Sequence, residues 1–512
     1  MEVELKLLVD SKYKDALLRH PLLSSQGASK PHEQNQSDTY FDTPDLQLRN
    51  SNVGLRVRRV NNSWIQNIKS GSSAQGGLHS RQEWESPVAG PAPELARLRH
   101  LIDDKKVRRN VLGAPALQRR LAPVFTTNIK RVVWDLQLQD GSRIECALDH
   151  GKIEHGGKNV PISELELELK SGDPRQLFDL ALGLQQDIPM HIGNRSKADQ
   201  GYSLLSPQPE AAVKATRLAL STAMTVEQAF QAIASNCISH MEANDQIVVK
   251  RHDIEGLHQM RVGMRRLRSA LNMFKGLLHL PEDMQKELDW LAGELGDARD
   301  WDVLAGTTLP SVAKYISDPT QVDGVQKAAS VKAQEHHVAT SAAVDSPRYT
   351  HLMLSMSRWV RTMGWHDAKG ETAATSDQLA QPVGRFARKI LKRDQRRLRT
   401  RAHNLRAATP EARHRLRIAA KKTRYAAEFF DSLFLPKTVR PYIKGLTGLQ
   451  DELGLLNDAA VADRLLTSIP SGQPQLDESV GFVKGFLAAR AIGEDKTIVK
   501  LWKKFERVCV PR

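Results

Sequence analysis

The sequence predicts an α+β protein of two domains, a barrel of antiparallel strands followed by a domain built only from helices. Over residues 1–203 apolar and polar side chains alternate with a period of two, which is typical of antiparallel strands. Over residues 222–508 the apolar residues recur at helical spacing instead. A chain of 512 residues is also too long for one ordinary hydrophobic core, which favours two domains.

Seven segments of the N-terminal half carry the alternation and are predicted strands. They are residues 2–8, 55–60, 64–69, 81–85, 131–138, 143–148 and 164–170. Helical segments are expected at residues 94–121 and 174–184. Prolines in Ser206–Pro209 end this pattern, and Thr225 with Gln228 three residues later is a typical start of a helix. We therefore place the domain boundary between residues 203 and 224.

Composition excludes several classes of protein. Three widely spaced cysteines, Cys146, Cys237 and Cys509, show neither zinc nor dithiol spacing and indicate a reducing compartment, so a cytoplasmic protein is expected. Neither an apolar run of membrane-spanning length nor a secretory signal is found. The net charge of +15 predicts attraction to polyanions, and its excess is concentrated between Arg385 and Arg424.

Several predicted strands carry only charged side chains on one of their two faces. Such a face is usually exposed to solvent, but here faces rich in acids and faces rich in cations occur in neighbouring strands. If they point into a closed barrel, the lumen holds carboxylates and cations together. The charged faces comprise Glu2, Glu4 and Lys6; Arg56 and Arg58; Arg81, Glu83 and Glu85; and Glu164, Glu166, Glu168 and Lys170.

This combination of charges suits a phosphate substrate with a divalent metal. Mg²⁺ and Mn²⁺ prefer carboxylate oxygens and complete their shells with substrate phosphates. Lysine and arginine neutralise the remaining phosphate charge, and arginine adds bidentate geometry. Phosphoryl transfer needs mainly positioning and charge stabilisation, with a metal-activated water as nucleophile. The faces therefore indicate a metal-dependent phosphohydrolase.

The N-terminal half resembles the CYTH superfamily of triphosphate tunnel metalloenzymes. Glu2-Val3-Glu4-Leu5-Lys6 is similar to its ExExK signature, and the similarity continues through Tyr40 to Pro44, Leu55 to Arg58, Ile68-Lys69, His79 to Glu83, Lys130-Arg131, Glu145 to Asp149, Glu164 to Lys170 and Ser196 to Ala198. Gln200 departs from the family, which often has a basic residue there, and this puts one peripheral phosphate contact in doubt.

The CYTH resemblance implies an eight-stranded antiparallel tunnel that splits a triphosphate with Mg²⁺ or Mn²⁺. The implied metal ligands are Glu2, Glu4, Asp149, Glu166 and Glu168. The implied triphosphate contacts are Lys6, Arg56, Arg58, Lys69, Arg81, Arg131, Lys170 and Lys197, and the residues expected to matter most for catalysis are Glu2, Glu4, Lys6, Arg56 and Arg58.

The helical half contains an internal duplication. The segment from His258 to Phe274 matches the segment from His414 to Phe430, with the histidine, four basic positions and the phenylalanine at the same offsets. On a helix, each copy places its basic residues in a stripe beside its apolar face. A single basic stripe is usually solvated, but stability alone does not require matching stripes in two copies, and like charges at this spacing repel. An anionic partner would relieve that repulsion.

This half resembles the CHAD family, a helical module linked to inorganic polyphosphate. Both His-x-x-Arg segments, Arg299 to Asp302 and Asn457-Asp458 carry the similarity. It implies two pseudo-symmetric four-helix units whose basic helices line one groove and bind polyphosphate. The residues expected to line the groove are His258, Arg261, Arg265, Arg266, Arg268, His414, Arg417, Lys421, Lys422 and Arg424.

The function expected from both halves is hydrolysis of inorganic triphosphate to diphosphate and phosphate, beside a domain that binds polyphosphate. Two alternatives remain open. The barrel could act on an organic triphosphate, as thiamine triphosphatases and one class of adenylate cyclase do, or the chain could be a non-catalytic binder of polyphosphate or nucleic acid. Basic patches without interleaved aromatic residues disfavour nucleic acid. The sequence leaves the oligomeric state open.

Overall fold

The computed structural model describes residues 2–24, 30–60, 63–112, 117–205, 211–367, 373–403, 405–469, 472–493 and 495–511. The chain divides into two compact units. Unit 1 contains Met1–Glu210 and Asp345–Thr362, and unit 2 contains Ala211–Val344 and Met363–Arg512. The Ser206–Pro209 segment, on which the predicted boundary depends, lies outside the described residues.

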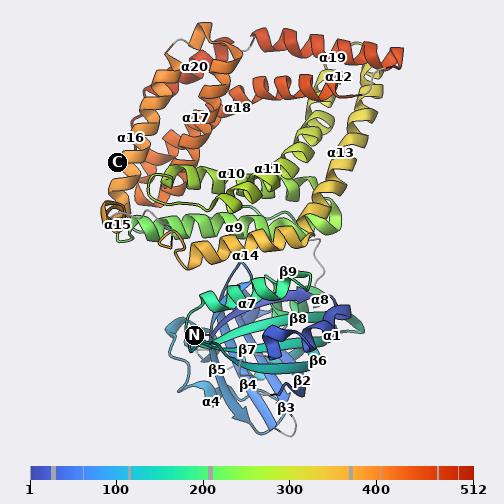
Figure 1. The fold of residues 1–512 in the computed structure, drawn as a ribbon, viewed down its shortest axis with the longest axis vertical. Helices are drawn as coiled ribbons and strands as arrows, with labels where there is room; N and C mark the ends of the chain where they lie inside the picture. The colour runs from blue at the N-terminus through green and yellow to red at the C-terminus, as the bar shows by residue number, and fades with distance from the viewer. Residues whose placement is uncertain are drawn as a thin grey trace. The chain divides into compact units, whose positions relative to one another are not determined.

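Unit 1 is built around one antiparallel sheet with the strand order β5-β4-β3-β2-β6-β7-β8-β1-β9 (Figure 1). An additional pairing of β5 with β1 closes eight of these strands, so the predicted eight-stranded barrel is confirmed. The strands are β1 (Glu2–Val9), β2 (His32–Asp42), β3 (Val53–Val60), β4 (Ser63–Gln75), β5 (Leu78–Val88), β6 (Ala122–Gln137), β7 (Arg143–His155), β8 (Lys158–Ser171) and β9 (Met190–Ile192).

Two of these strands are absent from the sequence-based prediction, and each has a physical reason. Strand β2 begins with a run of polar residues, His32 to Asp38, in which both faces are polar and no alternation is visible. Strand β9 has only three residues, which is too short for a periodic signal.

The barrel turns its charged faces inward and its apolar faces outward. Leu5 and Leu7 of β1 are fully buried on the face opposite Glu4 and Lys6. On β3, Leu55 and Val57 pack beneath the helical insert between β5 and β6, in one hydrophobic cluster that stabilises the outer wall. The outer apolar layer allows the interior to hold charges.

Short helices pack against the barrel. Helix α7 contacts β1 and β8, and α8 contacts β6, β7 and β8. The helical segments of this half are η1 (Ser11–Tyr13), α1 (Lys14–Leu18), α2 (Pro21–Ser24), α3 (Gln47–Asn50), α4 (Leu95–Leu98), α5 (Lys105–Leu112), α6 (Leu117–Arg120), α7 (Arg175–Gln185) and α8 (Lys197–Leu205). The predicted helix at residues 174–184 is present as α7, whereas the predicted helical insert at residues 94–121 is divided into the three short helices α4, α5 and α6.

Helix α14 (Pro347–Arg361) belongs to unit 1 although the surrounding sequence belongs to unit 2. It contacts α7 and β9. Arg358 Nε lies 2.6 Å from Asp179 Oδ1, and the Gln185 side chain donates to the Pro347 carbonyl oxygen. The barrel unit is therefore assembled from two separate stretches of the chain.

Unit 2 is helical and repeats one arrangement. Helix α9 precedes and packs on α10, as α16 precedes and packs on α17, and α10 and α17 contact each other. Thr225 caps α9 with the predicted capping box to Gln228. None of the described helices combines the length and hydropathy needed to cross a membrane. The segments are α9 (Val226–Arg251), α10 (Ile254–Phe274), α11 (Glu282–Val303), the π-helical η2 (Leu304–Thr308), α12 (Leu309–Ala313), η3 (Pro319–Val322), α13 (Asp323–Val344), α15 (Ala373–Leu379), α16 (Val383–Ala402), η4 (Leu405–Ala407), α17 (Pro410–Phe429), η5 (Asp431–Leu433), α18 (Pro436–Thr467), α19 (Pro474–Gly493) and α20 (Asp495–Glu506).

Gly201 lets α8 lie close against the barrel wall. A Cβ atom at this position would lie 2.2 Å from Cε2 of Phe125, whose ring also stacks on Tyr40. We expect Gly201→Ala to lower the free energy of unfolding by about 1–3 kcal/mol, because the ring has no free space to enter. Urea denaturation measures this effect. Gly90→Ala, where a Cβ meets nothing within 4 Å, is the control, and equal losses in the two variants would contradict the packing described.

Candidate active site

A cavity of about 910 Å³ lies inside the barrel, and charged side chains from most of the strands line it. Its lining includes every predicted metal ligand and triphosphate contact except Asp149. The predicted residues in the lining are Glu2, Glu4, Lys6, Arg56, Arg58, Lys69, Arg81, Arg131, Glu166, Glu168, Lys170 and Lys197.

The carboxylates of the opening strand are crowded and only partly neutralised. Lys69 Nζ lies 2.8 Å from both oxygens of Glu2. Burial raises the pKa of Glu2 to about 7, with the charges of Glu4 and Glu83 adding to the effect and Lys69 opposing it. Glu4 is 6% exposed, lies opposite Glu168 in the register of β1 and β8, and has no hydrogen bond or ion pair with any residue the structure describes.

These carboxylates fit a divalent metal ion. A buried carboxylate without a partner is costly, and a cation among its oxygens removes that cost. Burial, together with the charge of Glu145, also raises the pKa of Glu168, although Lys170 lies 2.8 Å from it. Oxygen donors only, with no nitrogen or sulfur ligand, suit Mg²⁺ or Mn²⁺. The predicted ligands Glu2, Glu4 and Glu168 could therefore hold such an ion, although among the described residues only Asp149, Glu164 and Glu166 bring their ligand atoms within 4.8 Å of one another.

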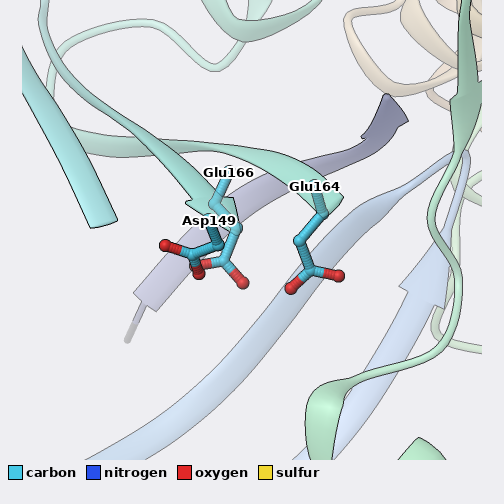
Figure 2. Close-up of side chains that lie close together, drawn as sticks. All are labelled: Asp149, Glu164 and Glu166. Carbon is cyan, nitrogen blue, oxygen red and sulfur yellow. The ribbon is translucent and has the colours of Figure 1, made fainter. Parts of the chain in front are cut away.

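A second group of carboxylates consists of Asp149, Glu164 and Glu166, which lie close together (Figure 2) and whose ligand atoms are within 4.8 Å of one another. The ammonium group of Lys197 already lies among them, at 2.7 Å from Asp149, 2.5 Å from Glu164 and 2.8 Å from Glu166. Although burial opposes it, Lys197 and its neighbouring cations hold the pKa of Glu166 well below its usual range. This acidic group is neutralised by the protein itself.

Lys6 and Arg131 complete this neutralised group. Lys6 Nζ lies 2.9 Å from Glu164 and 2.8 Å from Glu166. Arg131 donates to both oxygens of Asp149 at 2.7 and 2.6 Å, and to Glu166 at 2.6 Å. Asp149, a predicted metal ligand, is fully buried and holds Arg131 and Lys197 in this structure. Glu164 lies on the predicted charged face of β8. Its ion pairs with Lys6 and Lys197 make it part of the site.

Asp38 is a site residue that sequence reasoning missed. It lies on β2, is fully buried, and accepts from Arg58 at 2.8 and 2.9 Å and from Arg56 at 3.1 Å. Although burial opposes it, Arg58 and Arg56 lower the pKa of Asp38 to about 2. The carboxylate therefore fixes both guanidinium groups at the cavity. The polar run at the start of β2 shows no alternation, so no sequence signal pointed to this residue.

Strand β5 contributes both signs of charge. Glu83 lies 3.2 Å from Lys69 and shares a strand face with Arg81. Although burial opposes it, Lys69 and Arg56 lower the pKa of Glu83 to about 2. Arg81 donates to Nδ1 of His79 at 2.7 Å and makes no ion pair with any described acid. Its guanidinium is thus free to neutralise an anion in the cavity.

The repeated basic helices form a smaller groove in unit 2. Its volume is about 460 Å³, and Arg261 and Arg265 of α10 line it together with His414, Arg417 and Lys421 of α17. Burial and the charges of the neighbouring arginines lower the pKa of Lys421 to about 7. Arg261 and Arg417 are fixed by Asp300 of α11 and Asn457 of α18 respectively, each at 2.8 Å.

The other five predicted groove residues lie outside this lining. Arg266 is buried, donates to Asn236 and lies over the ring of Phe429. The remaining four are half-buried His258, Arg268 paired with Asp289, Lys422 bonded to Asn272, and Arg424 bonded to Gln450 and Glu428. Helical spacing predicted that the basic residues share one side of each helix. Which of them line the groove depends on the neighbouring helices.

Known proteins resemble both units. A family model for the CYTH domain matches residues 1–202, and a model for the CHAD domain matches residues 232–467. An inorganic triphosphatase from Haemophilus influenzae is 36% identical over 172 residues, which are 33% of this chain and 46% of that protein, so the similarity spans less than half of the relative. The crystal structure of the CHAD domain from the plant Ricinus communis is 36% identical and has a TM-score of 0.53. That similarity covers 59% of this chain and 99% of the plant chain.

Proposed function

Because the chain belongs to the CYTH family in residues 1–202 and to the CHAD family in residues 232–467, we propose that its barrel hydrolyses inorganic triphosphate with Mg²⁺ or Mn²⁺. The products are diphosphate and phosphate. One observation carries this proposal: the carboxylates of Glu2, Glu4 and Glu168, which are incompletely neutralised, face the same cavity as the guanidinium of Arg81, which makes no ion pair with any described acid. Neither set is electrostatically satisfied alone, and a metal with a triphosphate satisfies both.

The residues of the cavity divide the work of phosphoryl transfer. Glu2, Glu4 and Glu168 would hold the metal, which supplies charge neutralisation and an acidified water. Arg81, Arg56 and Arg58 would bind the phosphate oxygens, and the last two are pre-organised by Asp38. Arg131, Lys6 and Lys197 line the same cavity and would contact a further phosphate, although Asp149, Glu164 and Glu166 already balance their charges. Lys69 and Lys170, which pair with Glu2 and Glu168 respectively, would bind the triphosphate close to these carboxylates.

The cavity lining favours an inorganic substrate over an organic one. Its two aromatic side chains are already engaged: Tyr40 stacks on Phe125 at 4.4 Å, and the Tyr202 hydroxyl donates to Asp42 at 2.9 Å. The described lining therefore contains few aromatic residues, and both already pack or bond within the protein, which favours a substrate without a nucleobase or thiamine ring. The similar Haemophilus influenzae protein is an inorganic triphosphatase, which also supports this choice.

Turnover of three substrates tests the substrate assignment. With purified protein and Mg²⁺ or Mn²⁺, we expect kcat/KM to be highest for tripolyphosphate and lower for ATP and thiamine triphosphate. The three share a triphosphate and differ in the organic group, for which the cavity has no slot. A higher value for either organic substrate, or formation of cyclic AMP from ATP, would replace the inorganic assignment.

We propose that the helical unit binds inorganic polyphosphate in the groove between α10 and α17. Five basic side chains of the two repeats converge there, and burial together with repulsion from the neighbouring arginines lowers the pKa of Lys421 to about 7. A phosphate chain would relieve this repulsion. Competition between polyphosphate and RNA at fixed salt discriminates this ligand from nucleic acid, since both affinities fall with salt.

Lys421 should make polyphosphate binding depend on pH. Its pKa of about 7 means that the free groove loses a positive charge as pH rises through neutrality, and the bound anion restores it. Binding therefore takes up a proton, and affinity should fall by up to about tenfold per pH unit above pH 7. Titration calorimetry at about pH 6 and pH 8 measures the change. Lys421→Arg, which stays charged, should flatten this dependence, whereas Lys286→Arg on the exposed side of α11 should leave it intact. An unchanged dependence in Lys421→Arg would contradict the assignment.

A further inference from the structure

Helix α16 presents a second cationic surface, which we call the α16 stripe. It lines a separate cavity of about 940 Å³, whose fifteen lining residues include eight arginines and lysines and no acid. From the first to the last of these cations the helix rises about 24 Å. The stripe comprises Arg385, Arg388, Lys389, Lys392, Arg393, Arg396, Arg397 and Arg401.

The stripe is almost without acidic partners. Arg393 lies 2.9 Å and Arg397 3.8 Å from Asp394, the one acid on α16. The others make no ion pair with any described acid, and seven of the eight are exposed. Like charges three and four residues apart repel each other, so the helix would be more stable with fewer of them. Folding therefore does not explain the stripe.

The internal duplication does not explain it either. Helix α9 occupies the position before α10 that α16 occupies before α17, and the only lysine and arginine of α9 are Lys250 and Arg251. The stripe therefore belongs to the second copy alone, unlike the groove, which takes matching residues from both copies.

Helix α17 links the stripe to the groove through two adjacent lysines. Lys421 lines the groove. Lys422 donates to Asn272 at 3.1 Å, and its pKa is lowered by burial and by the charges of Arg401, Arg397 and Arg393, which belong to the stripe. Positive potential thus continues around α17 from one surface to the other.

We propose that the groove and the α16 stripe form one continuous track for a linear polyphosphate that is longer than the groove, with Lys422 between them. This inference rests on the proposed binding of polyphosphate in the groove. A bare phosphate chain fits better than single-stranded nucleic acid, which relies on stacking of its bases. Phe386 is the aromatic residue in the lining, and its ring packs against Phe274 and Phe430, so it offers no stacking platform.

Three charge-neutralised variants of the full-length chain test the track. The stripe variant combines Arg388→Gln, Lys392→Gln and Arg396→Gln, and the groove variant combines Arg265→Gln with Lys421→Gln. The control variant, Lys286→Gln with Lys314→Gln and Lys327→Gln, removes three exposed charges that line neither surface. Binding of long-chain polyphosphate is measured over a range of salt concentrations, with chelator present so that the barrel is inactive.

The stripe variant should bind long-chain polyphosphate at least about tenfold more weakly than the control variant. The slope of its log affinity against log salt concentration should fall by an amount that corresponds to about two lost phosphate contacts. Affinity equal to that of the control would overturn the track. Loss of affinity for single-stranded RNA with full retention of polyphosphate binding would also overturn it, because the stripe would then be a nucleic-acid surface. If the groove variant binds normally while the stripe variant is weakened, the proposed groove site fails, and with it the continuous track.

Discussion

Glu4→Gln is expected to abolish release of phosphate from tripolyphosphate while the barrel stays folded. The glutamine keeps the shape of the side chain but removes the negative charge that a metal ion requires. Because Glu4 is buried and has no described partner, the substitution breaks no ion pair within the protein. We expect kcat to fall by at least about 100-fold, as it does when a charge-stabilising group is lost from an active site. Steady-state release of phosphate at saturating Mg²⁺ or Mn²⁺ measures this.

Glu33→Gln is the matched control for Glu4→Gln. Glu33 is an exposed carboxylate of the same barrel, paired with Lys130 on the outer surface. The control should keep the wild-type rate, and circular dichroism should show both variants folded. A Glu4→Gln rate within a factor of about two of wild type would remove Glu4 from the proposed metal site.

Lys197→Met is expected to be the most destabilising single change in the barrel. Lys197 is 6% exposed and lies within 2.8 Å of three carboxylates, so its removal leaves buried negative charges without their main counter-ion. Breaking a buried ion pair from one side typically costs about 3–5 kcal/mol. Urea denaturation at pH 7 measures the loss. Lys158→Met, at an exposed position on β8, should cost little.

The pH dependence of Lys197→Met separates this electrostatic cause from lost packing. In the wild type, Lys197 helps to hold the pKa values of Asp149 and Glu166 low. These carboxylates therefore stabilise the folded state at pH values above their usual pKa, and this contribution is lost on acidification. In the variant, crowding raises the pKa of at least one of them above its unfolded value. The folded state of the variant then binds more protons than its unfolded state. The difference in free energy of unfolding between wild type and variant should therefore be smaller at about pH 5 than at about pH 7. An equal loss of free energy of unfolding at both pH values would indicate that lost packing alone is the cause.

The charged faces could be predicted from sequence because strand geometry is local. In a strand, residues two positions apart lie on the same face. Prediction of β1 and β8 as strands therefore also predicts which residues share a face with Glu4 and Glu168. Asp38 could not be found in this way, since the polar start of β2 hides its period. That Lys197 lies among three carboxylates depends on the close approach of α8 at Gly201, which is a tertiary contact.

The helical half shows the same limit. The duplicated spacing identified the basic arc of α10 and α17, but Arg268, which belongs to that arc, pairs with Asp289 instead. Arg266, which was also expected in the groove, donates to Asn236. Which side of an arc faces a groove depends on the neighbouring helices, and those are chosen by packing between distant segments. The same holds for α14, whose sequence is helical but whose contacts with α7 and β9 assign it to the barrel unit.

The most direct test of the proposed chemistry is product formation from tripolyphosphate by the full-length protein, with Mg²⁺ or Mn²⁺ and again with excess chelator. We predict that one phosphate and one diphosphate form for each tripolyphosphate consumed, and that chelator abolishes the reaction. Absence of products with both metals, or a reaction that continues unchanged in chelator, would contradict a metal-dependent triphosphatase.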